Sequence, residues 1–398
     1  MPPDFESRLR ALAARDDITA AVSYAHAHDT TTLALQVELS EIPAPPFAES
    51  ARGRRMKELL DASGLPKALS DDEGNVMVER PGMAGEAPLV VSAHLDTVFP
   101  DGTDVRVRRE GDLLRGPGIS DDARGLATLV MLARMLEAGS LRTRAPILFV
   151  ATVGEEGVGD LRGVKRLFAA GGVGQGARGF ISLDGAGLDR IVVRGLGSRR
   201  YRIVVQGAGG HSWVDWGTEN AIDALTALAH RLTDIELPRE PITTLTLARI
   251  GGGTSINAIP QEAWLEIDTR SEDAGRLDVL EAKIRQEVRD LTRKWGKLAF
   301  ETQVIGDRPS GHTAAEAPLV RAAMAATRAQ HREPVLASSS TDANVPMAAG
   351  IPALTMGCGG QAGQAHTTNE WYRNAGGVDG VVRAFHTLIL AAGLAPRA

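Results

Sequence analysis

Two residues that could serve a metal site, His94 and Asp96, lie in the segment SAHLDTV directly after a short apolar run. Side chains two positions apart in a strand point to the same side. A histidine that binds a metal needs its second ring nitrogen held, commonly by a carboxylate. The spacing therefore predicts a ligand and its orienting residue, although a purely structural His–Asp hydrogen bond would look the same.

Other acidic residues stand where further apolar runs end. Glu155 and Glu156 follow PILFVATVG, and Asp184 follows GFISL. Adjacent carboxylates at the end of a buried strand are unfavourable unless positive charge compensates them. Because neighbouring residues project differently, one of the two glutamates can bind a metal while the other faces a water molecule.

Two loops complete a possible ligand set. Asp121 lies in GPGISDDARG, where a helix cap is the simpler interpretation of the segment taken alone, and His366 lies in GQAHTTNEW. Open α/β sheets bind ligands at the carboxyl ends of their strands, so these side chains are expected to meet at one edge. The set for two metal ions is His94, Asp121, Glu156, Asp184 and His366.

The elements that position these residues are predicted from the pattern of apolar residues. Short apolar runs at 89–94, 146–153 and 179–183 are typical of buried strands, and 126–136 has helical spacing. Alternating strands and helices indicate an α/β domain with a mostly parallel sheet flanked by helices.

A second pattern interrupts the first near residue 198. Predicted strands and helices follow in the order βαββαβ, which is the ferredoxin-like arrangement, and the α/β pattern resumes after Pro309. We therefore expect a catalytic domain made of residues 1–197 and 309–398 and an inserted domain of residues 198–308.

Composition excludes several classes of protein. A hydrophobic share of 43% excludes a disordered chain, and a net charge of −6 gives no general attraction to nucleic acid or anionic membranes. The only cysteine, Cys358, excludes a site built from several thiolates. The charged N-terminal segment and the lack of a long apolar run predict a cytoplasmic protein without a membrane span.

Other catalytic motifs fit poorly. The chain has neither the G-x-S-x-G motif of serine hydrolases nor a P-loop. The segment GVGDLRG has the wrong glycine spacing for a dinucleotide site, so a nicotinamide oxidoreductase is a remote alternative.

Taken together, SAHLDTV, GPGISDDARG, ATVGEEG, SLDGAG and AHTTNEWY resemble the di-zinc metallopeptidase and amidohydrolase family of carboxypeptidase G, aminoacylase and peptidase T. The resemblance covers nearly the whole chain in the same order, and GEEGVGDLRG and LDGAG are most similar to peptidase T-like members. It implies a zinc exopeptidase-like catalytic domain, and it implies that the inserted domain is a lid that forms homodimers.

The resemblance also implies the metal ligands. His94 and Asp184 would hold one zinc ion, Glu156 and His366 would hold the other, and Asp121 would bridge both. It further implies a cis peptide bond after Asp121. Ligands without a thiolate suit zinc, and cobalt or manganese could substitute.

The remaining roles come from the same resemblance. Glu155 would be the general base, and Asp96 would support His94. In the inserted domain, His211 would reach the active site of a neighbouring subunit, and Asn257 and Arg270 would bind the substrate. Without the resemblance, a surface histidine, a loop cap and a surface salt bridge are the simpler interpretations of these last three.

The sequence therefore predicts an enzyme that hydrolyses an amide bond in a small peptide, as an exopeptidase of the aminopeptidase or dipeptidase kind. An N-acyl amino acid deacylase or a glutamate-type carboxypeptidase would use the same residues. A metal-binding protein that has lost catalysis is a third alternative, which the complete ligand set together with Glu155 disfavours.

Overall fold

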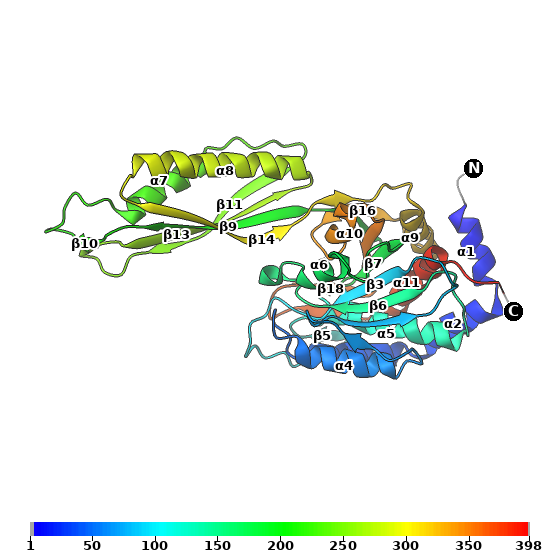
Figure 1. Ribbon diagram of the computed structural model, residues 1–398. Helices are drawn as coiled ribbons and strands as arrows, with labels where there is room; N and C mark the ends of the chain where they lie inside the picture. The colour runs from blue at the N-terminus through cyan, green and yellow to red at the C-terminus, as the bar shows by residue number, and fades with distance from the viewer. Residues whose placement is uncertain (1–3, 397–398) are drawn as a thin grey trace. The chain divides into compact units, whose positions relative to one another are not determined.

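The structure is a computed structural model that describes residues 4–396. The chain divides into two compact units. Unit 1 consists of Met1–Gly195 and His312–Ala398, and unit 2 consists of Leu196–Gly311. Figure 1 shows that unit 2 is one continuous stretch of chain, whereas unit 1 is built from the two stretches on either side of it.

The central sheet of unit 1 is mostly parallel. Its strand order is β1-β2-β6-β3-β7-β17-β8-β15, and β16 pairs with β8 outside this path. The strands are β1 (Leu69–Ser70), β2 (Val76–Arg80), β3 (Leu89–His94), β6 (Ile147–Thr152), β7 (Gly179–Leu183), β8 (Arg190–Gly195), β15 (Gly311–His312), β16 (Val335–Ser339) and β17 (Ala353–Met356). β3 runs parallel to β6 and β7, and β17 runs parallel to β7. The predicted α/β architecture is confirmed.

Apolar side chains on both faces of this sheet explain why its strands are continuous apolar runs. In β3, Leu89, Val91 and Ala93 pack into one hydrophobic cluster, while Val90 packs into another on the opposite face. The sheet is thus buried between two layers of helices, and polar side chains are displaced to the ends of the strands.

Unit 1 includes the helices α1 (Phe5–Ala13), α2 (Asp16–Ala27), α3 (Asp29–Ser40), α4 (Ser50–Asp61), α5 (Ala123–Ala138), α6 (Arg162–Phe168), α9 (Pro318–Ala329), α10 (Asn344–Ala348) and α11 (Gly377–Ala392). A 3-10 turn, η1, spans Gly157–Gly159. α5 packs against β3 and β7, and it is buried along almost its whole length. This helix begins two residues after Asp121, so its packing fixes one side of the predicted site.

A second, antiparallel sheet of unit 1 has the order β18-β19-β5-β4. Its strands are β4 (Arg108–Glu110), β5 (Leu113–Arg115), β18 (Gln361–Gly363) and β19 (Trp371–Arg373). The pairing of β5 with β19 joins segments that are far apart in sequence, because Trp371 pairs with Arg115. The loop that contains His366 lies between β18 and β19.

Unit 2 has the predicted βαββαβ order. Its elements are β9 (Gly197–Gln206), β10 (Gly210–His211), α7 (Ala221–Thr233), β11 (Thr243–Gly252), β12 (Ala258–Ile259), β13 (Glu262–Ser271), α8 (Ala274–Lys294) and β14 (Ala299–Arg308). The main sheet is antiparallel in the order β11-β13-β9-β14, and β10 and β12 form a separate short ribbon. This is the ferredoxin-like arrangement.

The two helices of unit 2 lie along the same face of its sheet (Figure 1). That face buries Tyr201, Ile203, Leu265 and Ile267 against α7 and α8. Because side chains alternate along a strand, charged residues lie on the opposite face of the sheet. There, Nε of Arg200 lies 2.9 Å from Oδ1 of Asp268 on the neighbouring strand. Among residues 4–396 there is no helix that combines the length and the hydropathy of a membrane span.

One buried histidine should make stability depend on pH. His386 of α11 is 6% exposed, and neither of its ring nitrogens has a hydrogen-bond partner in the described part of the chain. Burial lowers the pKa of His386 to about 4. In the unfolded chain the His386 side chain binds a proton near pH 6.5, whereas in the folded chain it does so only near pH 4. The folded state is therefore stabilised above pH 6.5, and this stabilisation is lost as the pH falls toward 4. Between pH 7 and pH 5 this group should cost about 2 kcal/mol of unfolding free energy.

The measurement is urea unfolding of His386→Leu at pH 7 and pH 5. This variant should lose less stability on acidification than the unmodified protein. The control, His26→Leu, replaces an exposed histidine and should leave the pH dependence unchanged. Equal pH dependence of all three proteins would contradict the prediction.

Candidate metal centre

The parallel strands bring the predicted ligands to one end of the sheet. His94 is the last residue of β3 and pairs with Thr152, the last residue of β6, so Glu155 and Glu156 follow at the same edge. Asp184 comes directly after β7, which lies on the other side of β3. Parallel register thus places the ends of three separate strands side by side.

Asp121 occupies the centre of this group. Its Oδ1 atom is 3.0 Å from Nε2 of His94, and its Oδ2 atom is 3.2 Å from Nε2 of His366. His366 Nε2 also lies 3.0 Å from Oε1 of Glu156. The two oxygens of one carboxylate therefore face two different imidazoles.

Among residues 4–396, three groups of His, Asp and Glu side chains have ligand nitrogen or oxygen atoms within 4.8 Å of one another. They are His94 with Asp121 and Asp184, Asp121 with Glu156 and His366, and His94 with Glu155 and Glu156. The first two groups share Asp121. They contain every residue of the predicted five-ligand set and nothing else.

The ionisable side chains of the site shift one another's pKa values. Hydrogen bonds to Asp121 and Glu156 raise the pKa of His366 to about 10. Removal from water raises the pKa of Asp184 to about 7, and the negative charge of Asp121 adds to this effect. Burial would raise the pKa of Asp121 too, but its bonds to His366 and His94 outweigh burial and lower it. Protonated imidazoles thus supply the positive charge that the carboxylates need.

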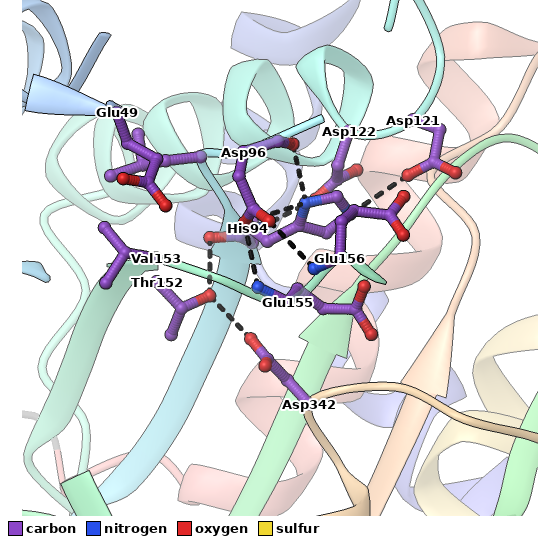
Figure 2. A network of polar contacts seen from close by, with 12 residues as sticks. Glu49, His94, Asp96, Asp121, Asp122, Thr152, Val153, Glu155, Glu156 and Asp342 are labelled. Carbon is purple, nitrogen blue, oxygen red and sulfur yellow. Dashed lines mark hydrogen bonds and ion pairs between the residues drawn. The ribbon is translucent and has the colours of Figure 1, made fainter. Parts of the chain in front are cut away.

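The carboxylate of Asp96 is fully buried and contacts more than His94. Its two oxygens accept hydrogen bonds from the backbone nitrogens of Glu155 at 2.9 Å and Glu156 at 2.8 Å (Figure 2). The Nδ1 atom of His94 lies 3.0 Å from the backbone carbonyl oxygen of Asp96 and 3.7 Å from its carboxylate. Asp96 therefore links the end of β3 to the segment that carries the two glutamates.

A family model described as "Peptidase family M20/M25/M40" matches residues 90–391. This match includes every residue of the two clusters that share Asp121. The chain belongs to peptidase family M20/M25/M40. The recognition made from the sequence motifs is confirmed, and the chain is a hydrolase that acts on peptide or amide C–N bonds.

Two curated relatives of this M20 chain carry provisional names. A protein of Aspergillus terreus, provisionally named a carboxypeptidase, is 26% identical over 306 residues, which are 70% of this chain and 69% of the relative. A protein of Mycobacterium tuberculosis, provisionally named a succinyl-diaminopimelate desuccinylase, is 26% identical over 352 residues. That alignment covers 84% of this chain and 92% of the relative.

Solved structures share the fold of this M20 chain. An aminopeptidase PepT from Bacillus cereus has a TM-score of 0.71 at 22% identity and covers 91% of this chain and 97% of its own. A dinuclear metal-binding peptidase of family M20 from Bacillus subtilis has a TM-score of 0.67 at 16% identity and covers 92% and 99%. These likenesses show that both structures share the fold of nearly the whole chain.

The donors of this M20 site fit a pair of divalent metal ions. Carboxylate oxygens and imidazole nitrogens are ligands of zinc, manganese and related ions, and no thiolate is among them. Two clusters joined by a single carboxylate match two ions rather than one. A metal ion would also replace the protons that the imidazoles take up in its absence. The peptide bond between Asp121 and Asp122 is cis, as the resemblance implied.

The sequence did not predict three buried acidic residues at this M20 site. They are Asp122, Asp342 and Glu370. The sequence around Asp122 indicates only a helix cap, and Asp122 does cap α5 by accepting a hydrogen bond from the backbone nitrogen of Gly125. Asp342 accepts a hydrogen bond from Thr152 (Figure 2). Asp342 and Glu370 lie in loops next to the strands β16 and β19, which was the only signal that could have marked these two residues.

The three predicted residues of unit 2 lie at two different places in that unit. His211 of β10 pairs with Ala258 of β12, which places His211 and Asn257 on the same ribbon. Both are exposed. Arg270 lies in β13, and its Nε atom is 2.7 Å from Oδ2 of Asp268. These contacts alone are those of surface residues.

Replacing the Asp184 carboxylate should have opposite effects on the stability of the metal-free protein and on its affinity for metal. Asp184→Asn deletes a negative charge beside Asp121 and Glu156, so the metal-free protein should unfold at an equal or higher temperature. The stabilisation gained on adding zinc should fall by at least about 1.4 kcal/mol, which is a tenfold weaker Kd.

Thermal unfolding with and without zinc provides this measurement. Asp101→Asn, at an exposed carboxylate, is the control and should behave like the unmodified protein. A variant of Asp184 that gains as much stability from zinc as the unmodified protein would contradict the assignment.

Proposed function

We propose that this chain is a two-zinc exopeptidase that hydrolyses an amide bond in a small peptide. The observation that carries the proposal is the position of Asp121, whose two carboxylate oxygens face His94 at 3.0 Å and His366 at 3.2 Å. A carboxylate shared in this way suits a ligand that bridges two neighbouring cations. Membership of the M20 family and the dinuclear metal-binding peptidase of the same fold support it.

In this proposal the residues near Asp121 divide between two ions. His94 and Asp184 would hold one ion, Glu156 and His366 would hold the other, and Asp121 would serve both. When bound, such a pair polarises the scissile carbonyl group and lowers the pKa of a water molecule toward ~7. Cobalt or manganese could replace zinc at these ligands.

Glu155 is the proposed general base. Its carboxylate is grouped with His94 and Glu156 but with neither Asp121 nor His366, whereas Glu156 contacts His366 directly. Glu155 is therefore placed beside the ligands without completing either cluster. It accepts a proton from the attacking water and delivers it to the leaving amine. Asp96 holds the backbone of both glutamates by accepting a hydrogen bond from each of their amide nitrogens.

A second candidate function uses the same residues. The two curated relatives carry the provisional names of a carboxypeptidase and of a desuccinylase, which removes an acyl group from an amine. Hydrolysis of an N-acyl amino acid or removal of a C-terminal residue is the same attack on an amide carbonyl. The geometry of the metal ligands does not distinguish these substrates, so the test must.

His211 is proposed to act in the active site of a partner subunit. Within β13 of unit 2, Glu262 lies opposite Gln206 and Arg270 lies opposite Ser198. The eight residue steps from Glu262 to Arg270 span roughly 27 Å. Arg270 therefore lies at the end where the chain enters and leaves unit 2, and His211 lies beyond the other end.

One small substrate cannot contact both of these residues within a single chain, because three extended residues span at most roughly 11 Å. If both residues bind substrate, Arg270 serves the active site of its own chain and His211 serves that of a partner. Two large apolar side chains close to His211 in the sequence are exposed: Trp213 is 84% exposed and Trp216 is 87% exposed. Exposed apolar side chains of this kind support the proposal that a partner subunit covers the loop that carries them. Asn257, on the same ribbon, would act from the partner too.

Hydrolysis of a defined panel tests the proposed function. Zinc-reconstituted protein should cleave dipeptides or tripeptides from one end, as detected by mass spectrometry of the products. Removal of the metal with a chelator should abolish cleavage, and added zinc should restore it. Full activity in thoroughly metal-stripped protein would contradict the proposal, and exclusive cleavage of N-acyl amino acids would establish the second candidate.

Glu155→Gln and Glu156→Gln form a matched pair within this test. Glu155→Gln keeps the size and polarity of the side chain and should retain both metal ions, while kcat falls by about 10²–10⁴. Glu156→Gln should instead lose metal on dialysis. The opposite pattern would reverse the two assignments.

Mixed dimers test the position of His211. Homodimers of the Glu155→Gln chain should be inactive, and homodimers of the His211→Ala chain should be severely impaired. When they are co-expressed, half of the dimers are mixed, and one site of each mixed dimer has neither defect. Activity should therefore recover to about a quarter of the unmodified value.

Arg270→Ala co-expressed with Glu155→Gln provides the matched control. If Arg270 serves its own chain, each site of the mixed dimer has one defect and no activity returns. A lack of recovery with His211→Ala, or a protein that is monomeric at the assay concentration, would contradict the arrangement.

A further inference from the structure

A buried glutamate outside the ligand groups holds the loop that carries Asp121. Glu370 is fully buried, with an exposed fraction of 0%. Its Oε2 atom accepts a hydrogen bond from the backbone nitrogen of Gly118 at 2.9 Å. Its Oε1 atom accepts hydrogen bonds from the backbone nitrogens of Ser120 at 2.8 Å and Asp121 at 3.0 Å. One carboxylate thus binds three amides of the segment that ends at the shared ligand.

These contacts join two distant parts of the chain that both supply ligands. Glu370 follows His366 by four residues, and the Asp121 loop lies about 250 residues earlier. The backbone already joins the two segments, because the nitrogen of Gly116 donates to the carbonyl oxygen of Glu370 at 3.0 Å and Trp371 pairs with Arg115. The carboxylate extends this connection past the end of the strand pairing as far as Asp121.

Two other buried carboxylates make the same kind of contact. Asp122 accepts hydrogen bonds from the backbone nitrogens of His94 at 3.0 Å and Gly185 at 3.1 Å, and Gly185 follows Asp184. Asp96 accepts from the backbone nitrogens of the two glutamates. Each segment that carries a ligand is therefore connected to another one by a carboxylate from a neighbouring segment.

We propose that Glu370 is a positioning residue for the shared ligand: its carboxylate fixes the backbone at Asp121 so that the Asp121 side chain lies between His94 and His366. Glu370 binds no metal itself, since its oxygens already accept three hydrogen bonds and it belongs to none of the ligand groups of residues 4–396. This inference rests on the proposed two-metal function.

The physical reason is the cost of leaving these amides without an acceptor. A buried backbone N–H that loses its partner is destabilised, and a charged acceptor makes stronger hydrogen bonds than a neutral one. In Glu370→Gln the side-chain NH₂ group replaces one acceptor oxygen and faces backbone N–H groups. The loop must shift to avoid this contact, and Asp121 shifts with it.

The experiment measures metal binding directly. Zinc affinity of the full chain is determined by competition with a chromogenic chelator, and the visible absorption of the cobalt-loaded protein reports the coordination of the ions. Glu370→Gln should weaken the binding of at least one ion by about 10-fold to 100-fold, as expected for a residue that orients a ligand. The cobalt spectrum should change as well.

The matched control is Asp71→Asn. Asp71 also accepts three backbone amides through one carboxylate oxygen, from Glu73, Gly74 and Asn75, but it lies in a turn that supplies no ligand. Both variants should lower the stability of the metal-free protein. Only Glu370→Gln should alter zinc affinity and the cobalt spectrum.

The outcomes separate this inference from the proposed function. Unchanged zinc affinity and an unchanged cobalt spectrum in folded Glu370→Gln would overturn the positioning role while leaving the two-metal site intact. If the unmodified protein bound no metal, the proposed function itself would fail. Should Glu370→Gln not fold, Glu370→Asp keeps the charge but is one methylene shorter, and the same loss of affinity is expected.

Discussion

The crowding of negative charge at one end of the parallel sheet is the constraint from which the organisation of the site follows. Carboxylates that lie close together in a region shielded from water repel one another and resist ionisation. Burial raises the pKa of Asp184 to about 7, and the negative charge of Asp121 adds to this shift. Hydrogen bonds to Asp121 and Glu156 raise the pKa of His366 to about 10, because these two carboxylates stabilise a positive charge placed between them. Other contacts in the folded protein must therefore compensate the unfavourable electrostatic energy of placing these carboxylates together.

The structure holds this arrangement through the backbone. The buried side chains of Asp96, Asp122 and Glu370 each accept hydrogen bonds from backbone amide N–H groups of the segments that carry the ligands. Arg52 contributes to the same region, since its buried guanidinium donates a hydrogen bond to the carbonyl oxygen of Leu95 at 2.8 Å. Each contact joins elements that are distant in sequence. The ligand positions are therefore a property of the folded unit and not of any one segment.

The ferredoxin-like unit has a different physical character. Its core lies on one face of its sheet, and the ion pairs of the other face keep that face hydrated. For the proposed role of unit 2, the length of its strands is more important than the burial of its residues. Eight residues of β13 lie between Arg270 and the end of the strand that is next to the ribbon of His211, so these residues can contribute to one small substrate only if they come from different chains. In the proposed arrangement, a domain inserted between two parts of a catalytic unit would in this way serve a neighbouring subunit.

The architecture, and the residues that gather at one end of the sheet, could be predicted from the sequence, whereas the contacts among these residues could not. Apolar runs such as 89–94 and 179–183 end at His94 and just before Asp184, and strands buried on both faces leave few other places for such polar residues. The period of the pattern also predicted the βαββαβ order of unit 2. Local pattern is sufficient for these features because it reflects burial within one element.

Which groups meet depends on the packing of elements against one another. No local pattern shows that Glu370 reaches the amide of Asp121, or that the two oxygens of Asp121 face different histidines. These contacts depend on parallel register and on the pairing of β5 with β19, which join residues about 250 positions apart. A hydrogen bond between such residues leaves no periodic trace in the sequence, because its geometry is fixed by the packing of whole elements.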